Sequence, residues 1–282
     1  IDGGGSKCKA RLVDGAGRLL GAGVAGPANA FQDLALARRS MLESARRALA
    51  AAQLPETALA RLVVGAGLAG VNIPRVAREM EAWEHPFSRL YLGTDIHIAC
   101  LAAHGGEDGA VIVAGTGSVG YSSRGGVSCG GHGFPFGDKG SGAWLGLEAM
   151  KAVLLALDGL GPDTRLSTRV ESQLGASGLD LIDAMAGASQ RDYGALAPVV
   201  LECAELGDPV ARAVVEEGAA YLSDMAVKLL SGSEAALCML GGLGQRLQPW
   251  MRPEVTARMV SPLGQPDEGA VRFAVESFRR CG

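Results

Sequence analysis

Short apolar runs alternate with longer amphipathic segments through the first hundred residues. Apolar positions over 9–13 and 18–24, joined by the turn Asp14-Gly15-Ala16-Gly17, predict a β-meander at the start of the chain. The segment 31–53 is rich in Ala, Leu and Arg and contains no Gly or Pro, which predicts a helix. The later predicted elements of this half are strands over 61–66 and 88–94 and helices over 74–83 and 96–104.

The second half begins with a similar pattern. Residues 110–130 predict another strand meander, which ends in a glycine-rich stretch over 125–142. The other predicted elements are an apolar helix over 144–157, an almost wholly helical region over 165–230, a strand over 235–240, a turn over 241–244 and a helix over 269–280. The repeated order predicts two α/β domains, residues 1–107 and 108–282, that face each other, with a helical insertion at about 160–230 in the second.

Each half places a glycine-rich turn with a hydroxyl residue after its first apolar run. These turns are Gly3-Gly4-Gly5-Ser6 and Gly115-Thr116-Gly117-Ser118. Because glycine has no Cβ, successive N–H groups of such a turn can point into one concavity and bind phosphate oxygens. A third turn, Gly241-Gly242, follows the strand at 235–240 and would let an adenine or ribose pass close to the backbone. Any one of these is compatible with an ordinary β-turn, but three at strand ends favour a nucleotide.

Other nucleotide-binding motifs are absent from the sequence or are matched only in part. The chain has no Gly-Lys dipeptide, which excludes a Walker A loop, and no protein-kinase motif set. The match Gly65-Ala-Gly67-Leu-Ala-Gly70 follows a strand, with Asp95 at the end of the next strand, and imitates a dinucleotide fingerprint. However, Asn72, Ile73 and Pro74 separate its last glycine from the helix, so a dinucleotide fold is disfavoured.

Three carboxylates lie beside these glycine-rich segments. Asp2 adjoins the first turn, where it could hold Mg²⁺ directly or through water. Asp95 ends a predicted strand and is either the general base for an attacking hydroxyl or the N-cap of the following helix. Asp138, within Gly137-Asp-Lys-Gly-Ser141, could serve a ligand, cap the following helix, or do both.

Composition narrows the classes of partner. A net charge of −4 with five lysines argues against nucleic acid. The six cysteines are scattered without a C-x-x-C pair, which favours reduced, mostly buried thiols, and the pair Cys129 and His132 lacks further zinc ligands. No signal peptide or run of about 18 apolar residues is present. We therefore expect a cytoplasmic protein without a membrane span. Because Ile1 lies inside an apparent strand, we also expect a native chain that begins a few residues before it.

These motifs together resemble the superfamily of sugar kinases, Hsp70 and actin, whose members share a duplicated βββαβαβα core with ATP in the cleft. Within it the chain is similar to the BadF/BadG/BcrA/BcrD-type group, which contains N-acetylglucosamine kinase and bacterial glucosamine kinase. The matching positions, which span essentially the whole chain, are Ile1–Ser6, Asn29, Thr94-Asp95, Ala114–Ser118, Gly130–Gly142, Leu240–Gly242 and Glu268–Ala270.

The resemblance implies an α/β fold of two ribonuclease H-like (actin-like ATPase) domains, each with a mixed five-stranded sheet, facing across a cleft. It also implies ATP and Mg²⁺ as cofactors. The implied nucleotide-binding residues are Gly3, Gly4, Gly5, Ser6, Lys7, Thr116, Gly117, Ser118, Gly241 and Gly242. The implied sugar-binding residues are Asn29, Asp95, Gly131, His132, Gly133 and Asp138, with Asp95 as the catalytic base and Asp2 as the Mg²⁺ ligand.

Three positions depart from the group's pattern. Ser6 stands where threonine is usual and keeps the hydroxyl, while Lys139 stands where glutamate or glutamine often follows the loop aspartate. Dehydratase activators of the same group hold an iron–sulfur cluster through a cysteine after Asp-Lys. Here that position is Gly140, which argues against a cluster.

The expected activity is transfer of the γ-phosphate of ATP to the 6-hydroxyl of an amino sugar. The residues leave open whether the sugar is N-acetylglucosamine, glucosamine or another hexosamine. The alternative is an ATP-hydrolysing activator or regulator of the same fold that phosphorylates no sugar. The long apolar helices of the insertion make a homodimer plausible.

Overall fold

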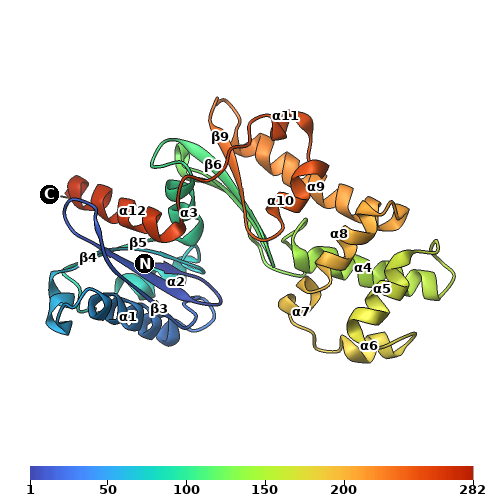
Figure 1. Cartoon of the computed structure of the whole chain (residues 1–282), viewed down its shortest axis with the longest axis horizontal. Coiled ribbons are helices and arrows are strands. Elements are labelled where there is room, and N and C mark those ends of the chain that lie inside the picture. The colour runs from blue at the N-terminus through green and yellow to red at the C-terminus, as the bar shows by residue number, and fades with distance from the viewer. Residues whose placement is uncertain (282) are drawn as a thin grey trace. The chain divides into compact units, whose positions relative to one another are not determined.

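The computed structural model describes residues 1–281 and consists of two compact units (Figure 1). The first unit is formed by Ile1–Gly109 together with the chain from Pro262 onward, and the second by Ala110–Ser261. The sequence pattern predicts a single division of the chain, after residue 107. The structure instead returns the C-terminal segment to the first unit.

The first unit is a five-stranded mixed sheet covered by helices. The strand order is β3-β2-β1-β4-β5; β1, β4 and β5 run parallel, and β2 is antiparallel to both β1 and β3. Its elements are β1 (Asp2–Gly3), β2 (Cys8–Val13), β3 (Leu19–Ala25), α1 (Leu34–Ala51), the 3₁₀-helix Glu56–Arg61, β4 (Val63–Leu68), α2 (Pro74–Glu81), β5 (Arg89–Thr94), α3 (Asp95–Ala103) and α12 (Pro266–Cys281).

Small residues let the helices of this unit approach the sheet closely. At Gly65 of β4, a Cβ atom would overlap the Ala270 carbonyl of α12, and at Gly67 it would overlap the Ile98 side chain of α3. The two glycines are therefore packing positions, because a side chain at either would push a helix off the sheet. The fingerprint-like match at 65–70 thus has a packing role at these two glycines.

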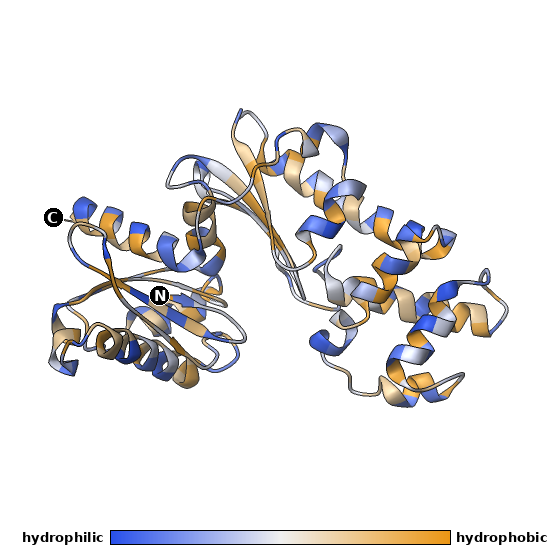
Figure 2. Ribbon diagram, in the orientation of Figure 1, coloured by the Kyte–Doolittle hydropathy of each residue, from blue (hydrophilic) through white to orange (hydrophobic). Residues whose placement is uncertain are grey.

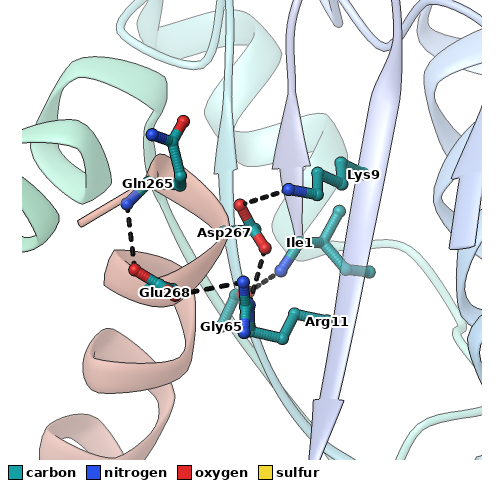
Figure 3. Close-up of polar contacts among 7 residues, drawn as sticks. All are labelled: Ile1, Lys9, Arg11, Gly65, Gln265, Asp267 and Glu268. Carbon is teal, nitrogen blue, oxygen red and sulfur yellow. Dashed lines mark hydrogen bonds and ion pairs between the residues drawn. The ribbon is translucent and has the colours of Figure 1, made fainter. Parts of the chain in front are cut away.

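A buried ion-pair cluster fastens α12 to β2. Asp267, only 2% exposed at its side chain, accepts from Lys9 Nζ at 2.9 Å and from Arg11 Nε at 2.7 Å (Figure 3). Glu268 on the same turn pairs with Arg11 at 3.1 Å and accepts from the Gln265 backbone N–H at 3.0 Å. These contacts explain why the C-terminal helix belongs to the first unit. No local sequence pattern marks Asp267 as the centre of this cluster.

The second unit joins a smaller sheet to a helical region. The sheet order is β8-β7-β6-β9, with β7 antiparallel to β6 and β8. Its elements are β6 (Gly109–Ala114), β7 (Ser118–Ser122), the 3₁₀-helix Arg124–Gly126, β8 (Val127–Gly130), α4 (Gly142–Leu157), α5 (Arg165–Leu174), α6 (Asp180–Ala184), α7 (Gln190–Gly194), α8 (Ala197–Glu205), α9 (Pro209–Leu229), β9 (Ala236–Leu240), α10 (Gly244–Leu247), the 3₁₀-helix Gln248–Trp250 and α11 (Pro253–Thr256).

The α/β class is confirmed, but the expectation of five strands in the second sheet is wrong. Within the described residues that sheet has four strands, and the place of a fifth is taken by one parallel bridge between Leu237 and Met259. The Leu237 N–H donates to the Arg258 carbonyl, and Val260 donates back to Leu237, both at 2.9 Å. The bridge cannot lengthen far, because α11 precedes it closely and Pro262 lacks the N–H that a ladder needs.

Each unit has its own hydrophobic core. In the second unit α4, α8 and α9 bury large side chains such as Leu145, Leu201 and Leu222 in one cluster. Hydrophobic residues concentrate on the strands and alternate with hydrophilic ones along the long helices (Figure 2). Among residues 1–281, no helix combines the length and apolarity needed to cross a membrane. Four cysteines, Cys8, Cys100, Cys203 and Cys238, are buried, as expected.

Candidate functional site

In the first unit, the predicted site residues gather where the parallel strands end. The sheet register places Gly3 opposite Leu68, and Leu68 opposite Thr94. The segments that leave these three positions therefore emerge at one edge of the sheet: the turn of residues 4–7, the loop from Ala69, and Asp95. Carboxyl ends of parallel strands are a common place for ligand sites.

The first glycine-rich turn is open. Its backbone closes through Gly4 N–H to the Lys7 carbonyl at 3.0 Å. A Cβ built on Gly4 or Gly5 meets no atom within 4 Å, and Ser6 and Lys7 are exposed. Gly3 differs, because its Cβ would lie 2.5 Å from Leu68 and 2.9 Å from Ala28. Gly3 is thus a packing residue, whereas residues 4–7 leave space for a ligand at the backbone.

Backbone hydrogen bonds place Asn29 beside this turn. Ala28 N–H donates to the Gly4 carbonyl at 2.8 Å, and Ala30 N–H donates to the Ala69 carbonyl at 2.9 Å. The Asn29 side-chain Oδ1 accepts from the N–H of Phe31 at 3.1 Å and Gln32 at 3.2 Å. Its Nδ2 group has no partner within the part of the chain that the structure describes. That amide remains available to donate to a ligand hydroxyl.

Asp95 stands at the first residue of α3, and it is not the cap. The N-cap is Thr94, whose hydroxyl accepts from His97 N–H at 3.2 Å. The Asp95 carboxylate accepts from the Ile96 N–H at 2.9 Å. Burial raises the pKa of Asp95 above its ordinary value, against the opposing effect of its backbone hydrogen bonds. A carboxyl group with a raised pKa is a better proton acceptor than a free aspartate.

Asp2 lies on β1 near the same edge. Burial raises the pKa of Asp2, and the negative charge of Asp95 adds to that increase. Its carboxylate has no hydrogen bond or ion pair among residues 1–281. A partly buried carboxylate without a partner fits a cation, and phosphate oxygens and water would complete the coordination of a hard ion such as Mg²⁺. Among the described residues there is no group of three or more His, Cys, Asp or Glu that could hold a metal ion alone.

In the second unit, the turn of residues 115–118 joins β6 to β7 and is held from several sides. Gly115 N–H donates to the Gly117 carbonyl at 2.9 Å. The first N–H groups of α4 donate to the turn, Gly142 to the Gly115 carbonyl at 2.7 Å and Ala143 to the Thr116 carbonyl at 3.2 Å. The Ser118 hydroxyl is buried and donates to the Lys139 carbonyl at 2.9 Å. Thr116 is exposed and a Cβ at Gly115 would meet open space, so these two face outward.

Asp138 anchors the predicted sugar loop to this turn. Its carboxylate is buried and accepts from Gly133 N–H at 3.2 Å through Oδ1. A Cβ on Gly117 would lie only 2.6 Å from Oδ2, which explains the glycine there. Asp138 has φ of 61°, a left-handed conformation that is uncommon outside glycine and that asparagine and aspartate tolerate best. The cap of α4 is Ser141, which accepts from Trp144 N–H at 3.2 Å, so Asp138 is not that cap.

The other residues of the loop are more open. Gly131 N–H donates to the Ser118 carbonyl at 2.9 Å, which fastens the start of the loop beside β7. Gly131 and His132 are exposed, and Gly133 has open space at its Cβ position. Lys139 pairs with Glu217 at 2.7 Å and lies 5.6 Å from the centre of the Trp144 ring. Lys139 thus forms a structural contact between the loop and the helices α9 and α4.

The turn after β9 lies beside the turn after β6. Gly241 has φ of 87°, and a Cβ there would overlap the Ala114 carbonyl, so only glycine fits. Leu243 N–H donates to the same carbonyl at 3.1 Å. Gly242 is exposed, and a Cβ on it would meet open space. Gly241 is therefore required by the close approach of the two turns, and Gly242 leaves room for a ligand.

Sequence reasoning missed Gln190 in α7 of the insertion. Its side-chain Nε2 donates to Asp138 Oδ2 at 3.1 Å and to the Thr116 carbonyl at 3.4 Å. The only local signal is the capping box of Ser189 and Asp192, which predicts a helix start but no contact. Its role depends on a contact between residues 52 positions apart, which local patterns do not encode.

A cavity of about 480 Å³ in the first unit lies away from these residues. Its lining includes Leu12 and Val13 at the end of β2 and Val63 and Val64 at the start of β4. These are the opposite ends of the strands from the turn of residues 4–7 and Asp95. The cavity lies next to Ile1, where β2 and β4 extend past the start of the two-residue strand β1, and we assign no ligand to it.

The structure also bears on the cluster-binding alternative. Gly140 has φ of 78°, and a Cβ there would lie 2.8 Å from the Gly218 carbonyl and 2.9 Å from Leu222. A cysteine at this position would require α9 to move. The loop of this chain is therefore packed in a way that does not fit an iron–sulfur ligand.

Two sheets, each with a glycine-rich turn at a strand end, define the class: the chain has the actin-like ATPase fold. The model of the BadF/BadG/BcrA/BcrD ATPase family matches residues 1–274. The chain belongs to this family.

Several relatives are named as amino-sugar kinases. The chain is 35% identical to the glucosamine kinase GspK of Vibrio cholerae serotype O1 over 97% of this chain and 94% of that protein. It is 27% identical to the N-acetyl-D-glucosamine kinase of Dictyostelium discoideum over 80% of this chain and 76% of that protein. A solved structure described as a "Putative N-acetylglucosamine Kinase" from Chromobacterium violaceum superposes with a TM-score of 0.87 at 33% identity, covering 97% of this chain and 96% of that one.

Proposed function

We propose that the protein is an ATP-dependent kinase that phosphorylates the 6-hydroxyl of an amino sugar, N-acetylglucosamine or glucosamine. The observation that carries the proposal is the position of Asp95. Its carboxylate is partly buried, has a raised pKa and leaves the cap of α3 to Thr94. It emerges at the same sheet edge as the open turn of residues 4–7.

The first unit supplies the acceptor chemistry in this proposal. The Asp95 carboxylate accepts the proton of the 6-hydroxyl as that oxygen attacks the γ-phosphorus of ATP, whose bond to the bridging oxygen breaks and releases ADP. Asn29 donates its free Nδ2 to a ring hydroxyl and holds the sugar in place. General-base assistance of this kind contributes about 10²–10⁴-fold, and positioning provides much of the remaining rate enhancement.

The second unit supplies phosphate and nucleotide contacts. The Thr116 hydroxyl and the N–H groups of Thr116 and Gly117 bind phosphate oxygens, as do the N–H groups of residues 5–7 in the first unit. The backbone at Gly242 lets the adenosine pass closely. Mg²⁺, with Asp2 as its protein ligand, would neutralise charge on the phosphates when bound.

The loop of residues 131–138 contacts the sugar and distinguishes its substituents. Gly131, His132 and Gly133 present backbone and an imidazole to the hydroxyls and the 2-substituent. Asp138 uses one carboxylate oxygen on Gly133 of the loop and the other on Gln190 of α7, so its contribution to sugar binding is to hold Gly133 in place. The names of the relatives support both glucosamine and N-acetylglucosamine as substrates to be tested.

An ADP-release assay tests the proposal. The purified protein is incubated with Mg-ATP and either N-acetylglucosamine, glucosamine, N-acetylmuramate, glucose or no sugar, and the product is identified by mass and by phosphorus–proton coupling to carbon 6. We expect turnover that depends on an amino sugar. Equal turnover without sugar would indicate the alternative, a regulatory ATPase, and no stimulation by any hexosamine would refute the kinase.

A further inference from the structure

Three segments of the second unit meet at one side-chain amide. Gln190 Nε2 carries two hydrogens, and its two acceptors belong to different segments: the Thr116 carbonyl in the turn of residues 115–118 and Asp138 Oδ2 in the loop of residues 131–140. The other oxygen of Asp138 accepts from Gly133. This side chain thus adds a link between the predicted phosphate turn and the predicted sugar loop, beside the hydrogen bonds that Ser118 makes with Gly131 and Lys139.

The helix that carries Gln190 is itself firmly placed. The capping box of Ser189 and Asp192 fixes the start of α7, and Tyr193 packs its ring 5.1 Å from that of Phe134 in the loop. The Tyr193 carbonyl lies so close to Gly146 of α4 that a side chain at Gly146 would not fit. The amide of Gln190 is therefore held by a rigid support, which is what a positioning contact requires.

The glycine at position 117 fits the same arrangement. A Cβ there would lie 2.6 Å from Asp138 Oδ2 and 3.3 Å from Gln190 Nε2, so this glycine leaves the space in which the two side chains meet. Asp138 also holds its left-handed φ at this point. A non-glycine residue in this region is usually sustained by surrounding contacts, and here those contacts come from Gly133, Gln190 and the backbone of Ser118.

We propose that Gln190 is a positioning residue that couples the turn of residues 115–118 to the loop of residues 131–140, so that ligand binding at one segment sets the position of the other. The proposal deepens the function proposed above and rests on it for its effect on catalysis. Its structural basis, the link between two segments, is independent of the substrate. In wild type, an amino sugar then raises the affinity for nucleotide, and nucleotide raises the affinity for the sugar equally.

The first test removes the amide. Gln190→Ala and Gln190→Met delete the donor, and Gln173→Ala on α5, which is exposed, serves as the matched control. We expect kcat/KM to fall about 10- to 100-fold, as for a small misplacement of substrate groups. The increase in ADP affinity caused by the sugar, measured by calorimetry, should disappear in both Gln190 variants and persist in the control. Thermal unfolding verifies that all variants are folded.

A second variant distinguishes positioning from a general loss of packing. Gln190→Glu places a carboxylate against Asp138, and two close carboxylates share a proton at low pH. The shared proton restores a hydrogen bond to Asp138 Oδ2, so the activity of Gln190→Glu relative to wild type should rise as the pH falls, whereas that of Gln190→Met should not. The other titratable groups near Asp138 are His132, Lys139 and Tyr221, and wild type measured at each pH corrects for them.

Hydrogen exchange without ligand separates this inference from the proposed function. Loss of the link should speed amide exchange across residues 115–118 and 131–140 in Gln190→Ala and Gln190→Met, even if no sugar is phosphorylated. Wild-type exchange and wild-type sugar–nucleotide coupling in both variants would overturn the inference. Equal behaviour of Gln190→Glu and Gln190→Met at every pH would also overturn it.

Discussion

The two glycine-rich turns have almost the same sequence pattern and very different surroundings. In the first turn, Ser6 and Lys7 are exposed and the backbone is closed by a single hydrogen bond from Gly4. In the second, Ser118 is buried, and the turn accepts hydrogen bonds from the start of α4 and from Gln190. The first turn is open to a ligand on both its backbone and its side chains, whereas the second offers chiefly Thr116 and its backbone.

The difference shows that a hydroxyl residue in a glycine-rich turn has no fixed role. The Ser6 hydroxyl has no partner in the part of the chain that the structure describes and is free to bind a phosphate oxygen. The Ser118 hydroxyl instead holds the Lys139 carbonyl at 2.9 Å and thereby places the loop that follows β8. The first turn is closed by one backbone hydrogen bond of its own, and the second is held by the start of α4 and by the side chains of Ser118 and Gln190.

The largest effect is expected at Asp95, beside the open turn. Asp95→Asn should lower kcat by about 10²–10⁴-fold with little change in ATP affinity, because the amide cannot accept the proton. Glu84→Gln, an exposed carboxylate of the same unit, is the matched control. Turnover of Asp95→Asn near the wild-type level would exclude Asp95 as the base.

The pH dependence of turnover should also be set by Asp95. Burial raises the pKa of Asp95, so its proton is bound more tightly in the folded state than in the unfolded state. Turnover should therefore fall as the pH drops through this raised pKa, at a higher pH than for a free aspartate. The Asp95 carboxylate also lowers stability as the pH rises from its ordinary pKa through the raised one, so Asp95→Asn should not be less stable than wild type at neutral pH.

A smaller effect, on stability, is expected at Asp267, which pairs with two cations on the strand that follows the open turn. Lys9 and Arg11 follow this turn on β2 and meet at Asp267, and Asp267→Ala would leave both cations without their buried partner. We expect a loss of about 3 kcal/mol in the free energy of unfolding, measured in urea. Glu268→Ala, on the same helical turn but 41% exposed, should cost about 1 kcal/mol or less. Equal losses would show that burial of Asp267 is not decisive.

At Asp267 the stability should change with pH in the direction opposite to that at Asp95, because the pKa of Asp267 is lowered rather than raised. Burial alone would raise the pKa of Asp267, but hydrogen bonds from Lys9 and Arg11 outweigh it and hold the pKa below its ordinary value. The contribution of Asp267 to stability is therefore complete above the ordinary pKa of aspartate and is lost as the pH falls through the lowered value. The difference in stability between wild type and Asp267→Ala should shrink in acid.

The smallest effect compares the two hydroxyls directly. Ser118→Ala should lower the free energy of unfolding by about 1–2 kcal/mol, because it leaves the Lys139 carbonyl unpaired in a partly buried place. Ser6→Ala should change it by less than about 0.5 kcal/mol, as is usual for exposed positions, and should instead raise the KM for ATP. A larger loss of unfolding free energy in Ser6→Ala than in Ser118→Ala would contradict the conclusion that the first turn is open and the second is held by contacts with other segments.

Much of the fold could be predicted from local patterns. The segment predicted as a helix over 31–53 forms α1, and the one predicted over 96–104 forms α3, with ends shifted by one to three residues. Caps account for the shifts at the N-terminal ends, since Asp33 and Thr94 accept from the N–H groups of Leu36 and His97 in the first turns of these helices. The five-stranded expectation for the second sheet failed because strand length there depends on neighbouring segments.

The sequence by itself determined the positions of the glycine-rich turns, the likeness to a family of ATPases and the aspartate at the end of β5, because each depends on residues close together in the chain. Only the tertiary structure decided which hydroxyl is free, that Asp267 is buried between two cations, and that Gln190 joins two segments. These properties depend on contacts between residues far apart, and the energy of such a contact is set by burial and by the partner's position. The same glycine–hydroxyl pattern can therefore form a turn that is open to a ligand in one unit and a turn that is held by hydrogen bonds from other segments in the other unit.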